Sequence, residues 1–309
     1  MNRKKLEGYK LTPSIHTTQI KTNAVDTSET TKNTLFCIND ISKKTNGDIK
    51  VIINANEFCG DLFSYEDFVG VFKFILNDMS IDDETYSIVR ADMRFDSYDE
   101  EDYRKYQKLN RYLISMLALA YKVKNTYRTD DLFSQQQISV AIKNSDFEIE
   151  NYDREKKNEI TGNTSEKAKS RLEERSKRHN TSNIWTVETL EKIFCKEWFK
   201  RWDKAINYRD EVHRKYNDNL VEIYFRDKDK RPVVFSSVNE FLKRYQDCIF
   251  TKGQMIDLLT RIGVKNPETA AKNYKTRYGC EFFSKSDVLY AIDQIKKATT
   301  EYFNSDQNK

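Results

Sequence analysis

The sequence predicts an α+β protein, in which a curved, mainly antiparallel sheet with packed helices is followed by a mainly helical C-terminal region. In the first half of the chain, stretches with alternating apolar and polar side chains are interspersed with stretches of helical periodicity. The 309 residues include only 8 glycines and 3 prolines, and no G-x-G-x-x-G or P-loop motif, which argues against a doubly wound nucleotide-binding fold. After residue 182 the pattern is mostly helical.

The first elements follow a polar N-terminal segment. Residues 1–30 are rich in Thr, Ser and Lys without apolar periodicity, and we expect a mobile N-terminal arm there. An α+β domain is expected over residues 31–182. Strands are expected at 34–38 and 49–58, where β-branched residues alternate with polar ones. A helix is expected at 65–79, because four apolar residues share one helical face: Phe68, Val71, Phe72 and Ile75.

The segment 85–97 is predicted to be a strand with two different faces. Its alternation places apolar residues on one face and four charged residues on the other: Arg90, Asp92, Arg94 and Asp96. A long amphipathic helix is expected at 106–123, and a β-hairpin at 137–152 that turns near residues 143–146. On composition alone, residues 166–179 read as a solvated helix, since helix formers dominate and apolar residues are few.

A mainly helical domain is expected over residues 183–309. Its first helix is amphipathic and lies at 187–206. Residues 219–237 are expected to form a hairpin, because two apolar stretches flank a turn-like polar segment. Three or four short helices are expected to follow, up to residue 297.

Residues 251–278 have the pattern of a helix-turn-helix. Thr251 can cap the first helix, Gly263 can end it, and Asn266 with Pro267 can begin the second. The second helix would expose side chains suited to a major groove and its phosphates: Lys272, Asn273, Lys275 and Arg277. The alternative is an ordinary helical hairpin with a basic solvated face.

Composition also narrows the classes of site and location. No apolar run is long enough to span a membrane, and the first residues lack the apolar core of a signal peptide, so we expect a cytoplasmic protein without a membrane partner. The 5 cysteines are scattered without a C-x-x-C pair, which supports neither a disulfide framework nor a zinc module. The 3 histidines form no H-x-H or H-E-x-x-H motif, so any metal is expected on carboxylates.

Four segments occur together in an order and spacing that resemble a known family. IKVIINANEF is similar to the strand MRVEFNPNKL, and IVRADMRFD to R-L-D-x-A-F-D. NSDFEIENYDREKKNE is similar to D-S-D-x-F-x-R-x-Y-N-K-x-x-E, and SRLEERSKR to the strand W-R-x-E-x-E-L-K-R. The set, over residues 34–180, resembles the replication initiators of small rolling-circle plasmids in Gram-positive bacteria. These are tyrosine DNA nickases of the Rep_trans type, and the chain would be a divergent phage or mobile-element member.

The resemblance implies a nucleophile and a metal site. The tyrosine of the Y-N-K motif falls on Tyr152, which would attack DNA and form a 5′-phosphotyrosine. The carboxylates that hold Mg²⁺ or Mn²⁺ would be Asp92, Asp96 and Glu173, and oxygen ligands suit such hard ions. Their alternative is a solvated sheet face. A phenol is a poor nucleophile at neutral pH, so an ion that polarises the phosphate and favours the phenolate is needed.

The resemblance also implies partners. Double-stranded and single-stranded origin DNA would be bound, with phosphate contacts from Arg90, Lys143, Arg154 and Arg171. A homodimer is implied because such initiators bind inverted repeats, and a host helicase is implied in a bacterial cytoplasm.

Four of the chain's departures from the family pattern bear on the proposed chemistry. Glu150 replaces a basic residue two positions before the tyrosine, and Arg175 replaces the second carboxylate of the R-x-E-x-E strand. Arg154 replaces a lysine and Ala141 a glycine. The first two changes indicate altered metal ligation or loss of nicking.

Three functions therefore stay open. The preferred one is a replication initiation protein that nicks and rejoins origin DNA through a phosphotyrosine. The second is a non-catalytic, sequence-specific DNA-binding regulator or accessory protein on the same scaffold. The third is an interaction protein without a nucleic-acid role. The small net charge of +4 favours this third function, and the basic side chains near Lys272 argue against it.

Overall fold

An antiparallel sheet forms the centre of the protein. The computed structural model describes residues 6, 8–23, 38–43, 48–55, 57, 64–82, 85–123, 139–162, 167–178, 184–230, 235 and 237–304. Within them the sheet has seven strands in the order β2-β3-β1-β4-β7-β6-β5, and neighbouring strands are antiparallel. Their bounds are β1 Thr12–Thr22, β2 Ile38–Lys43, β3 Ile49–Asn54, β4 Tyr86–Ser97, β5 Ser139–Lys143, β6 Phe147–Asp153 and β7 Ser170–Lys177.

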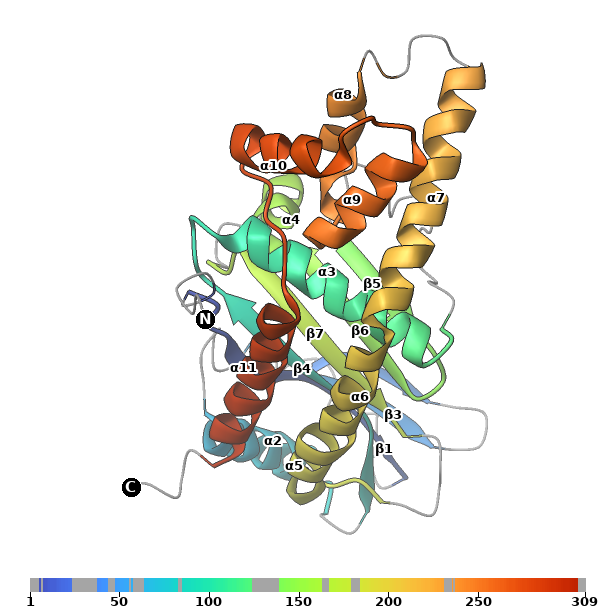
Figure 1. The fold of residues 1–309 in the computed structure, drawn as a ribbon. Helices are drawn as coiled ribbons and strands as arrows, with labels where there is room; N and C mark the ends of the chain where they lie inside the picture. The colour runs from blue at the N-terminus through green and yellow to red at the C-terminus, as the bar shows by residue number, and fades with distance from the viewer. Residues whose placement is uncertain are drawn as a thin grey trace.

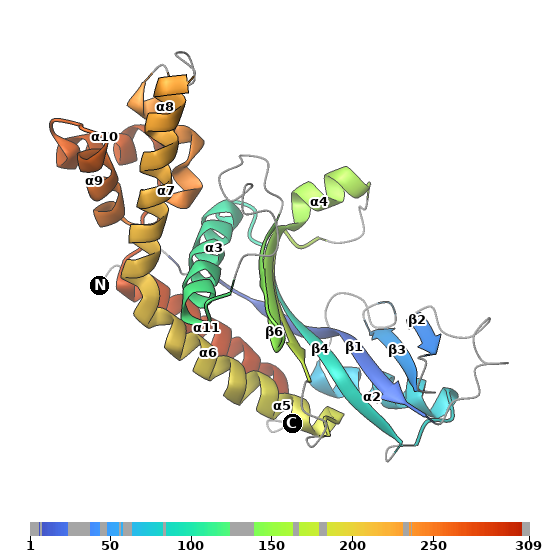
Figure 2. The same cartoon turned by 90° about the vertical axis from the view of Figure 1, so that its right-hand side faces the viewer.

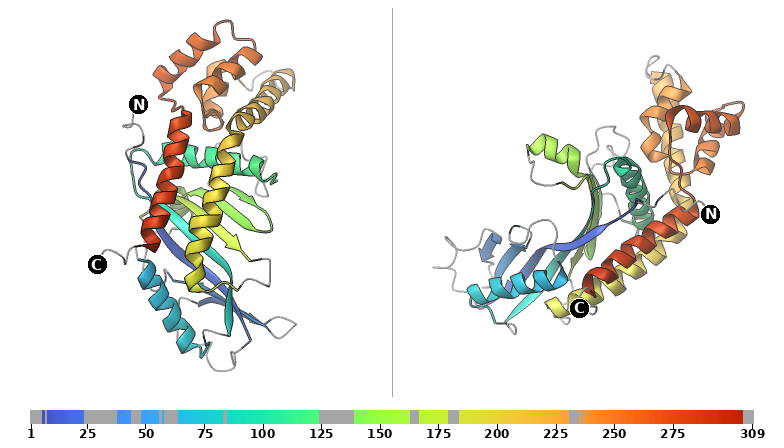
Figure 3. Two further views of the ribbon diagram at one scale, coloured as in Figure 1. Left: turned by 60° about the horizontal axis from the view of Figure 1, so that its bottom comes forward. Right: turned by 90° about the vertical axis from the view of Figure 1, so that its left-hand side faces the viewer.

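The sheet is strongly curved, as Figure 2 shows, because its strand direction turns between β6 and the β1–β3 end. The helices of the first half are α2 Tyr65–Asp78, α3 Tyr103–Ala120 and α4 Arg154–Thr161. Those of the second half are α5 Leu190–Lys192, α6 Trp198–Ala205, α7 Arg209–Lys230, α8 Val238–Arg244, α9 Lys252–Arg261, α10 Pro267–Tyr278 and α11 Lys285–Phe303. Helices α2, α3, α6 and α11 lie on the convex side of the sheet, whereas α4 projects over the concave side (Figures 2 and 3). The predicted α+β class, with a curved antiparallel sheet and a helical C-terminal region, is confirmed.

The convex face of the sheet carries the core. Alternate residues of a strand face opposite sides, so Leu172 and Ser176 of β7 point toward the helices. The Trp198 indole of α6 donates a 2.7 Å hydrogen bond to Oγ of Ser176, and the Trp202 indole donates a 2.9 Å bond to Oε1 of Glu174. Both tryptophans are fully buried, and α6 is thereby fixed against β7.

The C-terminal region packs on the same sheet and shares its core. Helices α8, α9 and α10 gather at one end of the molecule, at the top of Figure 1. Helix α11 then returns along α6 (Figure 3), where Lys296 Nζ lies 2.6 Å from Asp203 Oδ1. Buried residues of α9, α10 and α11 belong to one hydrophobic cluster with those of the strands. No described helix is both long enough and apolar enough to cross a membrane.

Several predicted elements are confirmed. Helix α2 buries the expected four apolar residues, and Ser64 caps it with a capping box to Asp67. The hairpin β5–β6 and the two-faced strand β4 are present. In the helix pair at 251–278, Thr251 accepts from the Gln254 amide, Gly263 takes a φ of 84°, and Pro267 begins α10. Of the strand expected at 34–38, only residue 38 lies within the described residues, as the first residue of β2.

The mobile arm expected over residues 1–30 is wrong for Thr12–Thr22, which form β1 in the middle of the sheet. Ile15 and Ile20 of this strand are completely buried. They lie five residues apart, a spacing that places them on opposite faces of a regular strand. The register against β4 shifts between Ile15 and Thr17, where β1 has one extra residue, and this bulge brings both isoleucines to the core.

Two other expectations are wrong. The solvated helix expected from the composition of 166–179 is wrong, because Ser170–Lys177 form β7. Arg171, Glu173 and Glu174 of this strand are buried and bonded to partners on neighbouring strands or on α6. The resemblance had indicated a strand there. The hairpin expected at 219–237 is helical up to Lys230, as part of α7. Leu220 and Tyr224 are buried four residues apart, which is helical spacing.

Candidate active site on the concave face

Charged side chains of β4, β6 and β7 lie on the concave face of the sheet. The register of β4 and β7 places Asp92 opposite Arg175, Arg94 opposite Glu173, and Asp96 opposite Arg171. On the other side of β7, Arg171 lies opposite Tyr152, and Glu173 opposite Glu150. Opposite charges therefore face each other between β4 and β7, which stabilises a polar face that is largely buried, whereas Glu150 and Glu173 are like charges directly opposite each other.

Tyr152 lies within this network. It is 6% exposed, and its hydroxyl donates a 2.8 Å hydrogen bond to Oε2 of Glu173. Burial, with the Glu173 charge, raises the pKa of Tyr152 above its usual value, although Arg171 acts in the opposite direction. Its ring is also surrounded by cations, since Lys157 Nζ lies 4.8 Å from the centroid, Arg154 Cζ 5.7 Å and Arg171 Cζ 5.9 Å.

Three side chains from three strands come together beside Tyr152. One potential ligand atom from each of His16, Asp92 and Glu173 lies within 4.8 Å of the other two. His16 is the extra residue of the β1 bulge, which turns its imidazole toward the concave face. The amide of the preceding Ile15 donates a 3.2 Å hydrogen bond to the Tyr302 hydroxyl at the end of α11.

The chemistry of this group suits a divalent metal ion. Nδ1 of His16 is buried without a hydrogen-bond partner. Burial lowers the pKa of His16 to about 4, so the imidazole is neutral at pH 7 and able to coordinate. Burial raises the pKa of Asp92 to about 6 despite a hydrogen bond from Arg90, as expected of a carboxylate that a cation would stabilise. Burial also opposes ionisation of Glu173, but His16 and Arg175 hold its pKa well below its usual range.

Asp96 does not join this group, contrary to the prediction. Both of its oxygens are occupied by the Arg171 guanidinium, at 2.6 and 2.9 Å, and Arg94 Nε lies 3.3 Å away. A carboxylate held by two buried arginines is electrostatically satisfied. The structure therefore brings together two of the three predicted carboxylates and adds His16.

Arg175 explains how Glu150 is accommodated on this face. Its guanidinium lies 2.6 Å from Glu173, 3.0 Å from Glu150 and 3.9 Å from Asp92, and it also pairs with Glu148. A positive charge thus stands where the family pattern has a carboxylate, and it neutralises the acidic residue at position 150. The two departures from the pattern compensate each other.

The residues expected to contact DNA form two groups, one on or next to the sheet and one on α10. Arg154 and Arg171 adjoin Tyr152, whereas Arg90 is hydrogen-bonded to Asp92 and Lys143 lies 3.3 Å from Glu148. The second group is on α10, at the end of the molecule beyond α3 (Figure 2), where all four side chains are exposed: Lys272, Asn273, Lys275 and Arg277. No contact links the two groups within the described residues.

Sequence reasoning missed His16 and Lys157. His16 was assigned to a mobile arm, because a bulge breaks the alternation that marks a strand. The spacing of Ile15 and Ile20 was the available signal, since both can be buried in one strand only if its register shifts. Lys157 stands where the family motif ends in Glu, and its place over Tyr152 depends on how α4 leaves β6.

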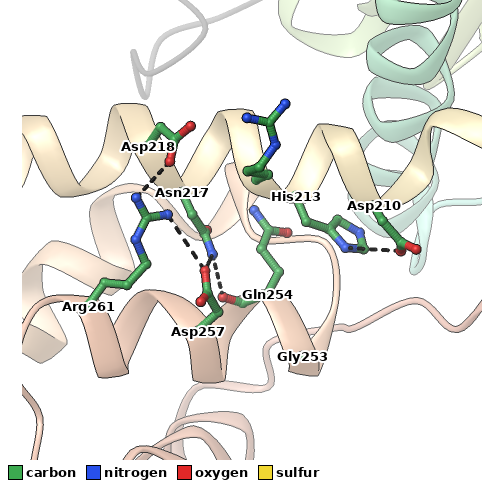
Figure 4. Close-up of a pocket in the computed structure, with 9 residues that line it drawn as sticks. Asp210, His213, Asn217, Asp218, Gly253, Gln254, Asp257 and Arg261 are labelled. Atoms are coloured by element: carbon green, nitrogen blue, oxygen red, sulfur yellow. Dashed lines mark hydrogen bonds and ion pairs between the residues drawn. The ribbon is translucent and has the colours of Figure 1, made fainter.

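A separate groove of about 420 Å³ lies between α7 and α9 (Figure 4). Its polar groups contact one another. Asn217 Nδ2 donates to Gln254 O at 2.9 Å and to Asp257 at 2.7 Å, while Arg261 Nη2 lies 2.6 Å from Asp218. These contacts clamp α9 to α7, and we assign the groove a structural role.

Known proteins add little evidence about the function of this site. No protein-family model matches the chain, and no curated protein matches it. One solved structure that does match is a rolling circle replication initiator protein from Geobacillus stearothermophilus. The match has 12% identity and a TM-score of 0.27, and it covers 54% of this chain and 74% of that chain.

Proposed function

We propose that this protein is a replication initiator that nicks and rejoins origin DNA through Tyr152. The observation that carries the proposal is the hydrogen bond from Tyr152 to Glu173, because Glu173 is also part of the His16 and Asp92 group. A phenol, a cation site and several arginines converge on one face, as transfer of a phosphoryl group to tyrosine requires. The ordered resemblance of four segments supports the same function.

The reaction would exchange one phosphodiester for another. A bond forms between the Tyr152 oxygen and the phosphorus, and the bond from phosphorus to the 3′ oxygen breaks. The phenol loses its proton and the leaving 3′ oxygen gains one, so the step is balanced and readily reversed to rejoin the strand. Glu173 orients the hydroxyl by accepting its proton in a hydrogen bond, and Arg154 and Arg171 offset the charge around it.

His16, Asp92 and Glu173 would hold the metal ion. An imidazole nitrogen suits a transition-metal ion better than Mg²⁺, so of the two expected ions this donor set favours Mn²⁺. When bound, the ion would polarise the phosphate and favour the phenolate.

The helical region would recognise duplex DNA through α10. The proposal divides the chain into a nicking domain, residues 31–182 together with strand β1, and a recognition domain, residues 183–309. A homodimer, a host helicase and a bacterial cytoplasmic location belong to the proposal through the resemblance alone.

The test uses supercoiled DNA of the protein's own replicon with Mn²⁺ or Mg²⁺. We expect an open-circular product with protein attached to a 5′ end, and none with Tyr152→Phe. DNA that is bound at a specific site but never cut, by wild type and variant alike, would contradict the proposal.

That outcome would favour the second function, a non-catalytic DNA-binding regulator. The observation in its favour is Arg175, whose guanidinium contacts both metal-site carboxylates and supplies a positive charge without any ion. The near-complete burial of Tyr152 agrees with it.

A further inference from the structure

The three cations around the Tyr152 ring differ in their other contacts. Arg171 is held by both oxygens of Asp96. Arg154 is buried. Lys157 is exposed, and among the described residues no carboxylate forms an ion pair with its ammonium. Lys157 is therefore the cation at this ring that can reach a group arriving from solvent.

The path of the chain places Lys157 over the ring. Strand β6 ends at Asp153, whose carboxylate accepts a 2.9 Å hydrogen bond from the Lys156 amide and so caps α4. Because the helix begins directly after Tyr152, its first turn brings residue 157 back over the tyrosine. Lys156 is rotated by about 100° from Lys157 on the helix, and among the described residues it makes no contact with the ring.

We propose that Lys157 binds a non-bridging oxygen of the DNA phosphate that lies beside Tyr152. The proposal rests on the proposed nicking function, and it names the residue that would position the phosphate for attack. An ammonium is a compact point charge that binds phosphate without fixed orientation, which suits a group whose charge is redistributed during transfer. Burial and the neighbouring Arg154 lower the pKa of Lys157, and a bound anion would oppose that shift.

Glu150 occupies a position where the family has a basic residue, and Lys157 supplies a positive charge near that position. Arg175 already neutralises Glu150 by an ion pair of 3.0 Å, so Glu150 does not need Lys157. Lys157 is not chemically changed in the proposed reaction. It holds the phosphate and offsets the negative charge of the forming phenolate.

The test uses the full chain with single-stranded oligonucleotides of about 20 nucleotides, tiled across the DNA beside its own coding sequence. Binding is measured in a Tyr152→Phe background, where no covalent product forms, and cleavage is measured with Tyr152 present. We expect Lys157→Gln to weaken binding about 3- to 10-fold and to reduce the slope of log affinity against log salt by about 0.7, the value for one phosphate on a single strand. Lys156→Gln is the matched control and should change neither, and Lys157→Arg should restore most of the binding.

The outcomes separate the two proposals. If wild type cleaves and Lys157→Gln matches Lys156→Gln in affinity, salt slope and rate, the role of Lys157 is overturned while the nicking function stands. If wild type never cleaves but Lys157→Gln still weakens binding with the reduced slope, the phosphate site stands and the nicking function fails. Absence of binding by the wild-type protein to every oligonucleotide would overturn both.

Discussion

Tyr152 hydrogen-bonds diagonally to Glu173, although its direct neighbour on β7 is Arg171. Diagonal pairs on adjacent strands are within reach of long side chains, and here the diagonal joins the phenol to a carboxylate of the His16 and Asp92 group. The direct neighbour, Arg171, is also bound by both oxygens of Asp96. The cross-strand register therefore places Glu173 within hydrogen-bonding distance of Tyr152, and Asp96 within hydrogen-bonding distance of Arg171.

Tyr152→Phe should abolish cleavage, by about 10³-fold or more, because no other group replaces a missing nucleophile. Binding of the uncut DNA should persist. Peptide mapping of the wild-type adduct should locate the DNA on Tyr152. Recovery of the adduct on Tyr208, or on Tyr127, would show that the assignment is wrong.

His16→Ala should weaken Mn²⁺ binding at least about 10-fold, because one of three ligands is lost. Titration calorimetry measures the affinity. Asp96→Asn is the informative comparison, since it should leave Mn²⁺ affinity nearly unchanged yet lower the free energy of unfolding by about 3 kcal/mol, through loss of the buried pair with Arg171. Equal loss of metal affinity in both variants would return Asp96 to the metal site.

Glu174 should make the stability of the fold depend on pH. Burial against α6 raises its pKa to about 8, above the ordinary value of 4.5, although a hydrogen bond from Trp202 favours the ionised form. The folded state therefore binds more protons than the unfolded chain between these values. The stability from the protonated carboxyl is complete below about pH 4.5 and is lost as the pH rises through about 8.

Glu174→Gln removes this titration and keeps an oxygen that accepts from the Trp202 indole. Thermal melts should show the variant gaining stability relative to wild type as the pH is raised from about 6 to about 9. A constant difference over that range would place the proton elsewhere.

On α10, Lys275→Ala should weaken duplex binding evenly across sequences and flatten the salt dependence by about one unit, as loss of one phosphate contact does. Asn273→Ala should instead cost about 1–3 kcal/mol at one base position. Lys215→Ala, at an exposed lysine of α7, is the control. If all three variants bind alike, α10 is scaffolding and recognition lies in the sheet domain.

Much of the sheet could be predicted because β5, β6 and the part of β4 from Arg90 onward alternate regularly. The alternation of β4 put Asp92 on the correct face, and the turn at 143–146 set the hairpin. The helix predicted from the composition of 166–179 was wrong, because most charged side chains of β7 are buried beside a partner and not solvated. A pattern of residue types does not show whether a charge has a partner two strands away.

The metal group was only half predictable. Asp92 and Asp96 share a strand face, and nothing in the sequence around them shows which of the two joins the metal group. The partner that claims Asp96 is Arg171, on another strand, and only the register shows it. His16 reaches the site through a bulge, which is a property of pairing between strands.

Helix α11 connects the proposed DNA-recognition helix, α10, with the bulge of β1 that carries His16. Six residues, 279–284, separate the end of α10 at Tyr278 from the start of α11 at Lys285. Helix α11 ends at Phe303, and the hydroxyl of Tyr302 accepts a hydrogen bond from the amide of Ile15, next to His16. A helix of 19 residues spans about 28 Å and resists bending. Mn²⁺ affinity compared with and without bound duplex would measure the resulting coupling. Because α11 joins these two regions, we predict that a duplex bound at α10 changes the Mn²⁺ affinity of the group around His16.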